Sequence, residues 1–492
     1  MSASAAPAER SDLIADVEAL IAEVLADPGL TALHTAAEAH ATRLGEPLRV
    51  AVVGEVNAGK STLVNALIGR RAAETSGGEN TYVNWWFRHG SPERMALRRP
   101  GGAVDEVPLG SAIGDLDLAS AAPVTVYCES PLLERLTVID TPGLYSLRRD
   151  NSRQTEDLIA LGRGQSVIGA RQADALLYLT SSDLPGARDQ DLLAGFTAAF
   201  GAVRVAPTNA LMVLSRADRR ADRRDATPPL EQAARLAARY RVDLFSCVWD
   251  IAPVSALGAF LARTDQIDGR AAAEVAHLAE VTREGGRRRL LADARYLRAE
   301  LETRGLPRLL ELVASGLDVY EARVLIEAAD GGATAAPELA RALEAASGLA
   351  PVEELLARTF GGRAELILAD AALSAIEAGS YRARDEIPLR EASRLRARCE
   401  TIRMSATGLQ DLADARTVLD PAVGFGLDEQ AELLAVFTAT PDTGGNGRPA
   451  DAGERARYWM GRANAVSTTP RQRGVAMRAH RRYAETTTRR GG

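Results

Sequence analysis

The chain has 492 residues, 46% of them apolar and 25% charged, with a formal net charge of −7. This length is too great for one hydrophobic core, so two or more domains are expected, and the composition is ordinary for a globular protein. The acidic balance argues against general nucleic-acid binding by the whole chain, and three widely spaced cysteines exclude a disulfide framework and favour a reducing cytoplasm.

Helices are the first elements expected along the chain. Apolar residues recur at helical spacing from Leu13 to Leu25, and a second helical stretch continues to about Arg43. Residues 1–46 are expected to pack with later helices. Because the sequence has neither an apolar signal core at its start nor a run of 18 apolar residues, it predicts a cytoplasmic location without a simple membrane span.

Short apolar runs follow, and helical patterns separate most of the later ones. This alternation predicts an α/β domain over residues 47–265, with a mostly parallel, doubly wound sheet. The stretch 88–123 is rich in Gly, Pro and charge, so it is expected to be an insertion or an edge hairpin. The predicted strands are 48–53, 82–87, 125–128, 135–139, 175–180, 210–214 and 248–251.

Strand patterns end near residue 269. An elongated α-helical bundle is expected over 266–440, followed by a flexible linker at 441–452 and basic helices at 453–492 that return to the bundle. From Arg448 onward there are eleven arginines and three carboxylates, so this tail carries +8 and the remainder −15. The predicted bundle helices are 271–304, 307–329, 337–378, 382–415 and 428–436.

The most specific motif lies between the first strand and the helical pattern after it. Residues 54–61 read Gly-Glu-Val-Asn-Ala-Gly-Lys-Ser and match the phosphate-binding loop G-x-x-x-x-G-K-[ST]. Loop N–H groups would face the β-phosphate, Lys60 would reach the β- and γ-phosphates, and the Ser61 hydroxyl would ligate Mg²⁺. Lys60 is the only lysine beside 58 arginines, as expected where a compact ammonium is needed. The expected nucleotide contacts here are Gly54, Asn57, Ala58, Gly59, Lys60, Ser61 and Thr62.

Two further elements would complete the phosphate site. Residues 138–143 read Val-Ile-Asp-Thr-Pro-Gly, where Asp140 would hold Mg²⁺ through a water and the Gly143 N–H would meet the γ-phosphate. A switch threonine is expected at Thr81, with Thr75 as the alternative, and its hydroxyl would ligate Mg²⁺. The structural alternative for residues 140–143 is a simple turn, and the alternative for Thr81 is a loop threonine without a role at the site. The predicted catalytic set is Lys60, Ser61, Thr81, Asp140 and Gly143.

Two stretches after later strands are expected to bind the base. Residues 215–218 stand where GTP-binding proteins usually carry Asn/Thr-Lys-x-Asp. Asp218 would accept from guanine N1–H and the 2-amino group, and the Arg216 stem would lie against the base, beside Ser215. A solvated helix start is the alternative, because two signature positions deviate. The backbone N–H groups of Ser255 and Ala256 would contact guanine O6.

Four segments together resemble a known family. GEVNAGKSTLVNALIG at 54–69 and SPLLERLTVIDTPGL at 130–144 strongly resemble the bacterial dynamin-like GTPases. TSGGENTYVNW at 75–85 and LSRAD at 214–218 look most like the isoniazid-inducible dynamin-like branch of actinobacteria. The likeness is specific across 48–260. Beyond it the likeness is architectural, and it implies a neck and trunk built from the helical bundle.

The resemblance implies hydrolysis of GTP with Mg²⁺, coupled to membrane remodelling or maintenance. Leu144 stands where other GTPases carry a water-orienting Gln, so activation by dimerisation is expected. Asn57 matches the position that holds K⁺ in some dimer-activated relatives. The implied partners are a second G domain, as a homodimer or with a paralogue, and an anionic surface at the inner face of the plasma membrane. Three departures are Glu74 in place of a proline, Ser215-Arg216, and no apolar paddle for lipid insertion.

Two other functions are kept as alternatives. The chain would be a GTP-dependent ribosome or RNA assembly factor with the arginine-rich tail as its RNA contact, although nucleic acid is not the expected partner of so acidic a body. It would otherwise be a nucleotide-binding partner of a paralogue, with little hydrolysis of its own. Turnover measured against protein concentration, and liposome binding compared with RNA binding, separate these functions.

Overall fold

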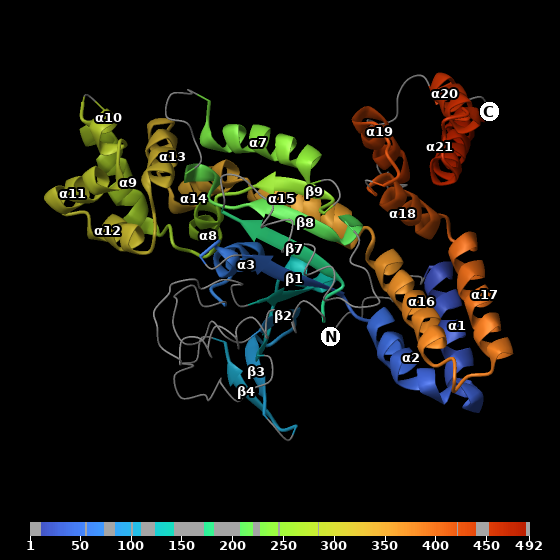
Figure 1. Ribbon diagram of the computed structural model, residues 1–492. Coiled ribbons are helices and arrows are strands. Elements are labelled where there is room, and N and C mark those ends of the chain that lie inside the picture. Colours follow the sequence, from blue (N-terminus) through green and yellow to red (C-terminus); the bar gives the residue numbers. More distant parts are fainter. Residues whose placement is uncertain are drawn as a thin grey trace, which may run out of the picture.

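A nine-stranded sheet forms the centre of the molecule, and helices lie on both sides of it and beyond it (Figure 1). The structure is a computed structural model. It describes residues 11–54, 57–72, 84–99, 102–109, 124–141, 172–181, 207–219, 227–244, 247–283, 285–420, 422–438 and 452–488.

Five parallel strands make up one half of the sheet, in the order β6-β1-β7-β8-β9. Strands β1, β6, β7 and β8 are buried along almost their whole length, which explains their apolar sequences. The strands are β1 (Leu48–Gly54), β6 (Leu136–Asp140), β7 (Ala175–Thr180), β8 (Ala210–Leu214) and β9 (Asp250–Pro253).

The other half of the sheet is mixed. Strand β2 (Trp85–His89) runs antiparallel to β6 and parallel to β5 (Val124–Cys128). Strands β3 (Arg94–Arg98) and β4 (Val104–Pro108) form the hairpin expected within 88–123 and close this edge of the sheet. The predicted mostly parallel sheet is confirmed. The strand expected at 82–87 is displaced to β2, which pairs with β5 along all of its length.

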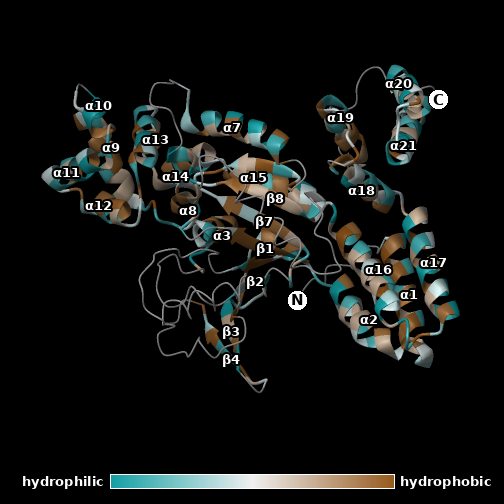
Figure 2. Ribbon diagram, in the orientation of Figure 1, coloured by the Kyte–Doolittle hydropathy of each residue, from teal (hydrophilic) through white to brown (hydrophobic). Residues whose placement is uncertain are grey.

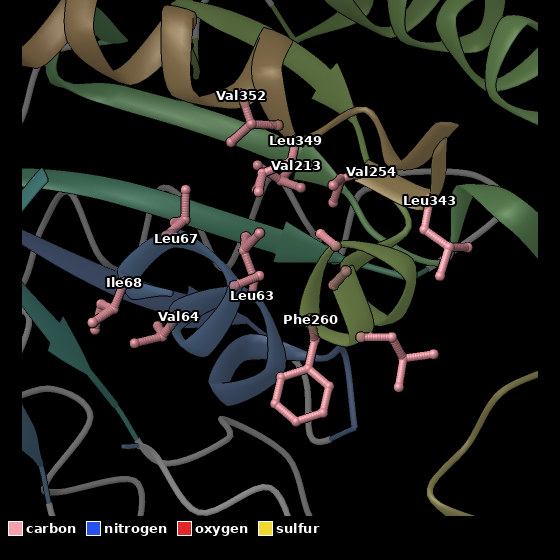
Figure 3. Packing of buried hydrophobic residues seen from close by; sticks show 14 of the residues in the cluster. Leu63, Val64, Leu67, Ile68, Val213, Val254, Phe260, Leu343, Leu349 and Val352 are labelled. Carbon is pink, nitrogen blue, oxygen red and sulfur yellow. The ribbon is translucent and has the colours of Figure 1, made fainter. Parts of the chain in front are cut away.

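Helices cover both faces of the sheet, so it is doubly wound as predicted. On one face, α3 (Lys60–Ile68), α8 (Ala256–Arg263) and α15 (Leu349–Leu356) bury apolar side chains against β1, β7 and β8. Figure 3 shows Leu63 of α3, Val213 of β8 and Val352 of α15 within this layer. On the other face, α7 (Pro229–Asp243) contributes Ala237 and Tyr240. Figure 2 colours the central strands as hydrophobic, which matches their burial.

The helices after the sheet divide into three groups. The first group starts beside α8 and reaches the far left of Figure 1. Its helices are α9 (Gly269–Thr282), α10 (Arg287–Leu290), α11 (Ala294–Arg304), α12 (Pro307–Ala314) and α13 (Val319–Asp330). It leads into α14 (Ala336–Ser347), which packs on α8, and then into α15. The first group therefore shares one continuous apolar core with the sheet.

The second group packs the two N-terminal helices against two helices from the later part of the chain. Helices α1 (Asp12–Ala26) and α2 (Thr31–Leu44) pack against α16 (Ala364–Arg382) and α17 (Leu389–Ser405) around a separate apolar core. Ser11 caps α1 by accepting from the N–H of Ile14.

The third group holds the basic tail. Helices α20 (Ala452–Asn464) and α21 (Pro470–Thr488) pack with α18 (Thr407–Val418) and α19 (Leu427–Thr438) around Trp459. Five tail arginines form ion pairs with carboxylates of this group or next to it. The pairs are Arg455–Glu432, Arg462–Glu429, Arg471–Asp420, Arg478–Asp414 and Arg482–Asp411.

The interval 266–440, predicted as one bundle, is instead shared among all three groups. The tail packs on α18 and α19, which lie within that interval. Glycines explain two of the breaks that periodicity missed, because Gly286 and Gly348 both adopt positive φ, at 83° and 78°. Within the described residues, no helix is long and apolar enough to cross a membrane.

Candidate functional site

The phosphate-binding loop follows β1 at the carboxyl edge of the sheet. Gly54 has a φ of 153°, and a Cβ there would lie 2.2 Å from the carbonyl oxygen of Leu179, so only glycine fits. Asn57 and Gly59 also have positive φ, at 63° and 89°, and Gly59 is the N-cap of α3. The loop therefore curls directly into a helix N-terminus, the arrangement that binds phosphate groups.

Lys60 lies inside this loop rather than on the surface. It is 7% exposed, and its Nζ donates to the carbonyl oxygen of Gly54 at 3.3 Å. Ala58, within the loop, is fully buried, whereas Ser61 and Thr62 are half-buried on the first turn of α3. The only lysine side chain of the sequence is thus folded back over the loop whose backbone would cradle a phosphate.

Asp140 ends β6 beside the loop. The Ser61 hydroxyl donates to Asp140 Oδ2 at 2.6 Å, which joins two residues 79 positions apart. The side chain is 5% exposed, and its Oδ1 has no hydrogen-bond partner among the described residues. Burial raises the pKa of Asp140 to about 6, against the lowering effects of the Ser61 hydrogen bond and the Lys60 charge.

This pair of oxygens fits a hard divalent cation. A buried carboxylate oxygen without a partner is costly, and bound Mg²⁺ would satisfy it. Ser61 Oγ and the Asp140 carboxylate supply the oxygen ligands that Mg²⁺ prefers. The residues present are therefore compatible with the predicted Mg²⁺ site.

Arg216 links the segment that is expected to bind the base to the phosphate loop. It has a φ of 53°, unusual for a residue other than glycine, and its Nη2 donates to the carbonyl oxygen of Asn57 at 2.5 Å. Ala256 lies on the same side, because a Cβ on Gly59 would be 3.9 Å from the Ala256 Cβ. The structure therefore brings residues of three distant segments together at one edge of the sheet.

Ser215 and Asp218 occupy different environments. Ser215 is fully buried, and its hydroxyl donates to the carbonyl oxygen of Thr180 at 3.2 Å, which fastens β8 to β7. The side chain of Asp218 is 6% exposed, and Arg219 Nε lies 3.6 Å from its Oδ2. Burial raises the pKa of Asp218. Its position after β8 agrees with the expected base-binding role, while Ser215 has a structural role within the sheet.

Sequence relatives are consistent with this geometry. Residues 49–202 match the family described as 50S ribosome-binding GTPase. Over 229 residues the chain is 35% identical to the isoniazid-induced protein IniC of Mycobacterium tuberculosis, and the match covers 45% of each chain. Over 152 residues it is 22% identical to dynamin-like protein 2 of Campylobacter jejuni, covering 30% of this chain and 23% of that protein. The chain is a relative of the bacterial dynamin-like GTPases.

The family match at 49–202 includes the phosphate loop and Asp140 of this dynamin-like chain. The chain spans less than half the length of the IniC relative. Among solved structures, one of an oligomerised bacterial dynamin pair aligns with 99% of this chain and 76% of its own, at 13% identity and a TM-score of 0.36.

Three residues expected from the sequence lie outside the described residues. They are Thr81, its alternative Thr75, and Gly143. Their roles at Mg²⁺ and the γ-phosphate stay predictions, as do the roles of all the other site residues toward a bound nucleotide.

One residue at this edge was missed by sequence reasoning. Glu321 of α13 is fully buried, and the Ser255 hydroxyl donates to its Oε1 at 2.9 Å. The pattern Asp318-x-x-Glu321 is typical of a helix start, and the structure has that capping box. The sequence signal therefore gave the helix boundary, but not the contact with a loop 66 residues earlier.

Proposed function

We propose that this dynamin-like chain binds GTP and GDP with Mg²⁺, hydrolyses GTP, and passes the nucleotide state to its helical groups. The observation that carries the proposal is the loop in which Lys60 folds over Gly54 beside the Ser61–Asp140 pair. Bound Mg²⁺ would supply positive charge to the phosphates. The chain's own contribution is to hold the triphosphate with loop N–H groups and Lys60, and the base with Asp218.

The decisive test measures GTP binding and turnover in magnesium buffer for the wild type and Lys60→Ala. The variant is expected to lose affinity for GTP about 100-fold, because a charge-assisted contact to the phosphates disappears. Arg288→Ala, an exposed cation on α10, is the matched control and should change neither quantity. Equal GTP binding by the wild type and Lys60→Ala would contradict the proposal.

We further propose that hydrolysis accelerates when two G domains pair. Turnover per molecule should then rise with protein concentration, alone or with a paralogue present. The K⁺ role of Asn57 belongs to this part, and it predicts faster turnover in K⁺ than in Na⁺ buffer. A flat, near-zero rate together with tight GTP binding would instead favour the non-hydrolysing partner of a paralogue.

The membrane target is proposed from the resemblance of the loop and strand motifs to dynamin-like GTPases. Among the eight arginines of the tail that the structure describes, five are in ion pairs with carboxylates of the third helical group or next to it. These five ion pairs reduce the charge that the tail can offer to an anionic surface, so binding through it should be salt-sensitive. Co-sedimentation with anionic and neutral liposomes, with GTP and with GDP, measures this contact.

A ribosome or RNA assembly factor is the second candidate, because the matched family is described as ribosome-binding. The same paired arginines and the net charge of −7 oppose an RNA contact through the tail. Nucleotide-dependent binding to ribosomal particles, without binding to liposomes, would favour this candidate over the membrane function.

A further inference from the structure

The loop that follows β9 is held by the junction between α14 and α15. The N–H of Ser255 donates to the carbonyl oxygen of Ser347, the last residue of α14, at 2.8 Å, and Ser255 is 0% exposed. Figure 3 shows Leu349, the first residue of α15, in the apolar layer that also contains Val254 of the loop. A distant segment of the chain therefore occupies one of the two amides that were expected to contact guanine O6.

Gly348 makes this close approach possible. It has a φ of 78°, and a Cβ there would lie 2.7 Å from the carbonyl oxygen of Pro253 and 2.8 Å from Leu230 Cδ2. The carbonyl belongs to the backbone at the end of β9, which cannot rotate away as a flexible side chain can. Any larger residue at this position must therefore push the junction away from the loop.

The N–H of Ala256 is left without a partner by this arrangement. Ala256 is the first residue of α8, and its N–H makes no hydrogen bond within the described residues, as is usual in the first turn of a helix. The Ser255 Oγ accepts from the N–H of Gly258, at 3.1 Å, and so serves another residue of that turn. Because the Ala256 Cβ is 3.9 Å from the Cβ position of Gly59, this free amide lies beside the phosphate loop.

The other side of the loop is fastened to the sheet. The N–H of Val254 donates to the carbonyl oxygen of Leu214 at 2.9 Å, and the carbonyl oxygen of Val254 accepts from the N–H of Ala217 at 3.2 Å. Both partners flank the start of the segment 215–218. The direction of the Ala256 amide is therefore set from two sides, by the end of β8 and by the α14–α15 junction.

We propose that Gly348 is a positioning residue for guanine recognition, because it lets the α14–α15 junction hold Ser255 and so direct the Ala256 N–H at O6. This inference rests on the proposed function of the site. It assigns one amide donor of the loop, rather than two, to the O6 atom. Displacement of the junction should weaken discrimination at O6 and leave the phosphate loop intact, whereas a purely structural role for Gly348 would leave that discrimination unchanged.

The test compares GDP with 6-thio-GDP, in which sulfur, a weaker acceptor, replaces O6 while the N1–H and the 2-amino group are kept. Calorimetry in magnesium buffer gives both affinities for the wild type, Gly348→Ala and Gly305→Ala. Gly305 is the matched control, because it also has a positive φ, 65°, and no atom of the described residues lies within 4 Å of a Cβ placed there. It carries the same kind of backbone strain without displacing a neighbour.

The wild type and Gly305→Ala should prefer GDP over 6-thio-GDP by about fivefold, the value of one net hydrogen bond. Gly348→Ala should reduce that preference to below about twofold. An undiminished preference in Gly348→Ala overturns the inference, and so does an equal loss of affinity for both nucleotides, which is the result of a general structural defect.

Two failures are distinguished by the wild type. If it binds neither nucleotide, the proposed function fails and the inference fails with it. If it binds GDP and 6-thio-GDP equally well, the inference alone is overturned.

A second variant covers the case in which thermal melting shows Gly348→Ala to be unfolded. Arg263 of α8 pairs with Glu344 of α14 at 2.6 Å and with Glu353 of α15 at 2.8 Å, so it fastens both sides of the junction to α8. Arg263→Met releases both helices and should also lower the preference to about twofold. An unchanged preference in Arg263→Met overturns the inference.

Discussion

The two edges of the parallel sheet satisfy their charged groups in opposite ways. At the carboxyl edge, the Oδ1 of Asp140 is buried without a hydrogen-bond partner among the described residues. At the amino edge, Asp174 precedes β7, and one of its oxygens accepts from Arg43 of α2 and from the N–H of Arg49 at 2.8 Å. Arg43 and Arg49 also pair with Glu46, at 2.5 and 2.6 Å.

This difference separates a ligand site from a structural joint. An unsatisfied buried oxygen gains free energy when a cation binds it, so the carboxyl edge is prepared for a ligand. A carboxylate already paired with arginine offers nothing to a ligand, but it joins the four-helix group to the sheet. Substitutions at the amino edge should therefore change stability without changing nucleotide affinity.

The largest expected effect is at the joint. Asp174→Ala removes one of the two carboxylates that pair with Arg43, at a site where the Arg43 and Asp174 side chains are 12% and 14% exposed. Loss of one member of such a pair should lower the free energy of unfolding by about 3 kcal/mol. Urea denaturation followed by tryptophan fluorescence measures this change. GDP affinity should stay within about threefold of the wild type, because Asp174 lies at the edge of the sheet opposite the phosphate loop. A larger loss would mean that the two edges are coupled.

A smaller effect, dependent on pH, is expected at the carboxyl edge. Burial, followed by the Asp218 charge, raises the pKa of Glu321 from 4.5 to about 7. Asp318, Arg219, Tyr320 and Ser255 are the other groups around it. Because the folded-state pKa lies above the unfolded value, the wild type loses stability as pH rises from 4.5 through about 7.

The glutamine of Glu321→Gln does not titrate. The free energy of unfolding of this variant should therefore rise relative to that of the wild type by about 2 kcal/mol between pH 5 and pH 8. The glutamine amide places an N–H donor against the N–H of Asp318, which lowers the free energy of unfolding by an amount that does not change with pH. Melting curves of both proteins across this range measure the slope of the difference. A difference that stays constant with pH would show that Glu321 does not carry the buried charge.

The smallest effect is expected at an exposed ion pair within the four-helix group. Arg394 of α17 contacts Glu23 of α1, with side chains 65% and 38% exposed. Glu23→Ala should lower the free energy of unfolding by less than about 0.5 kcal/mol, because solvent and salt screen such pairs. Measured beside Asp174→Ala under the same conditions, it shows whether burial decides the contribution of an arginine–carboxylate pair.

The sequence was most informative where a short segment allows only certain residue types, as in the buried strands and the phosphate loop. The strands at 175–180 and 210–214 have the predicted bounds, and the phosphate loop lies where its glycines and Lys60 placed it. Strand β9 begins two residues later than expected and reaches Pro253, because pairing with β8 decides its end. Such ends depend on partners that are distant in the sequence.

Long-range side-chain contacts were the part that periodicity could not give. The amphipathic pattern predicted helices at 271–304 and 337–378, but αL glycines such as Gly286 and Gly348 divide them into shorter ones. The approach of Glu321 to Ser255 depends on how α13 folds back onto the sheet, and a capping-box pattern contains no information about that partner.

The single lysine has a consequence for chemical modification of the protein. Lys60 is the only side chain in the sequence that carries a primary amine, and it lies within the phosphate loop. Any acylation of a lysine side chain, enzymatic or by a reagent, must therefore fall at this position and would remove the charge that is proposed to face the phosphates. A bound nucleotide should protect it, so amine labelling measured at the peptide that contains Lys60, apart from the N-terminal α-amine, would report on occupancy of the loop.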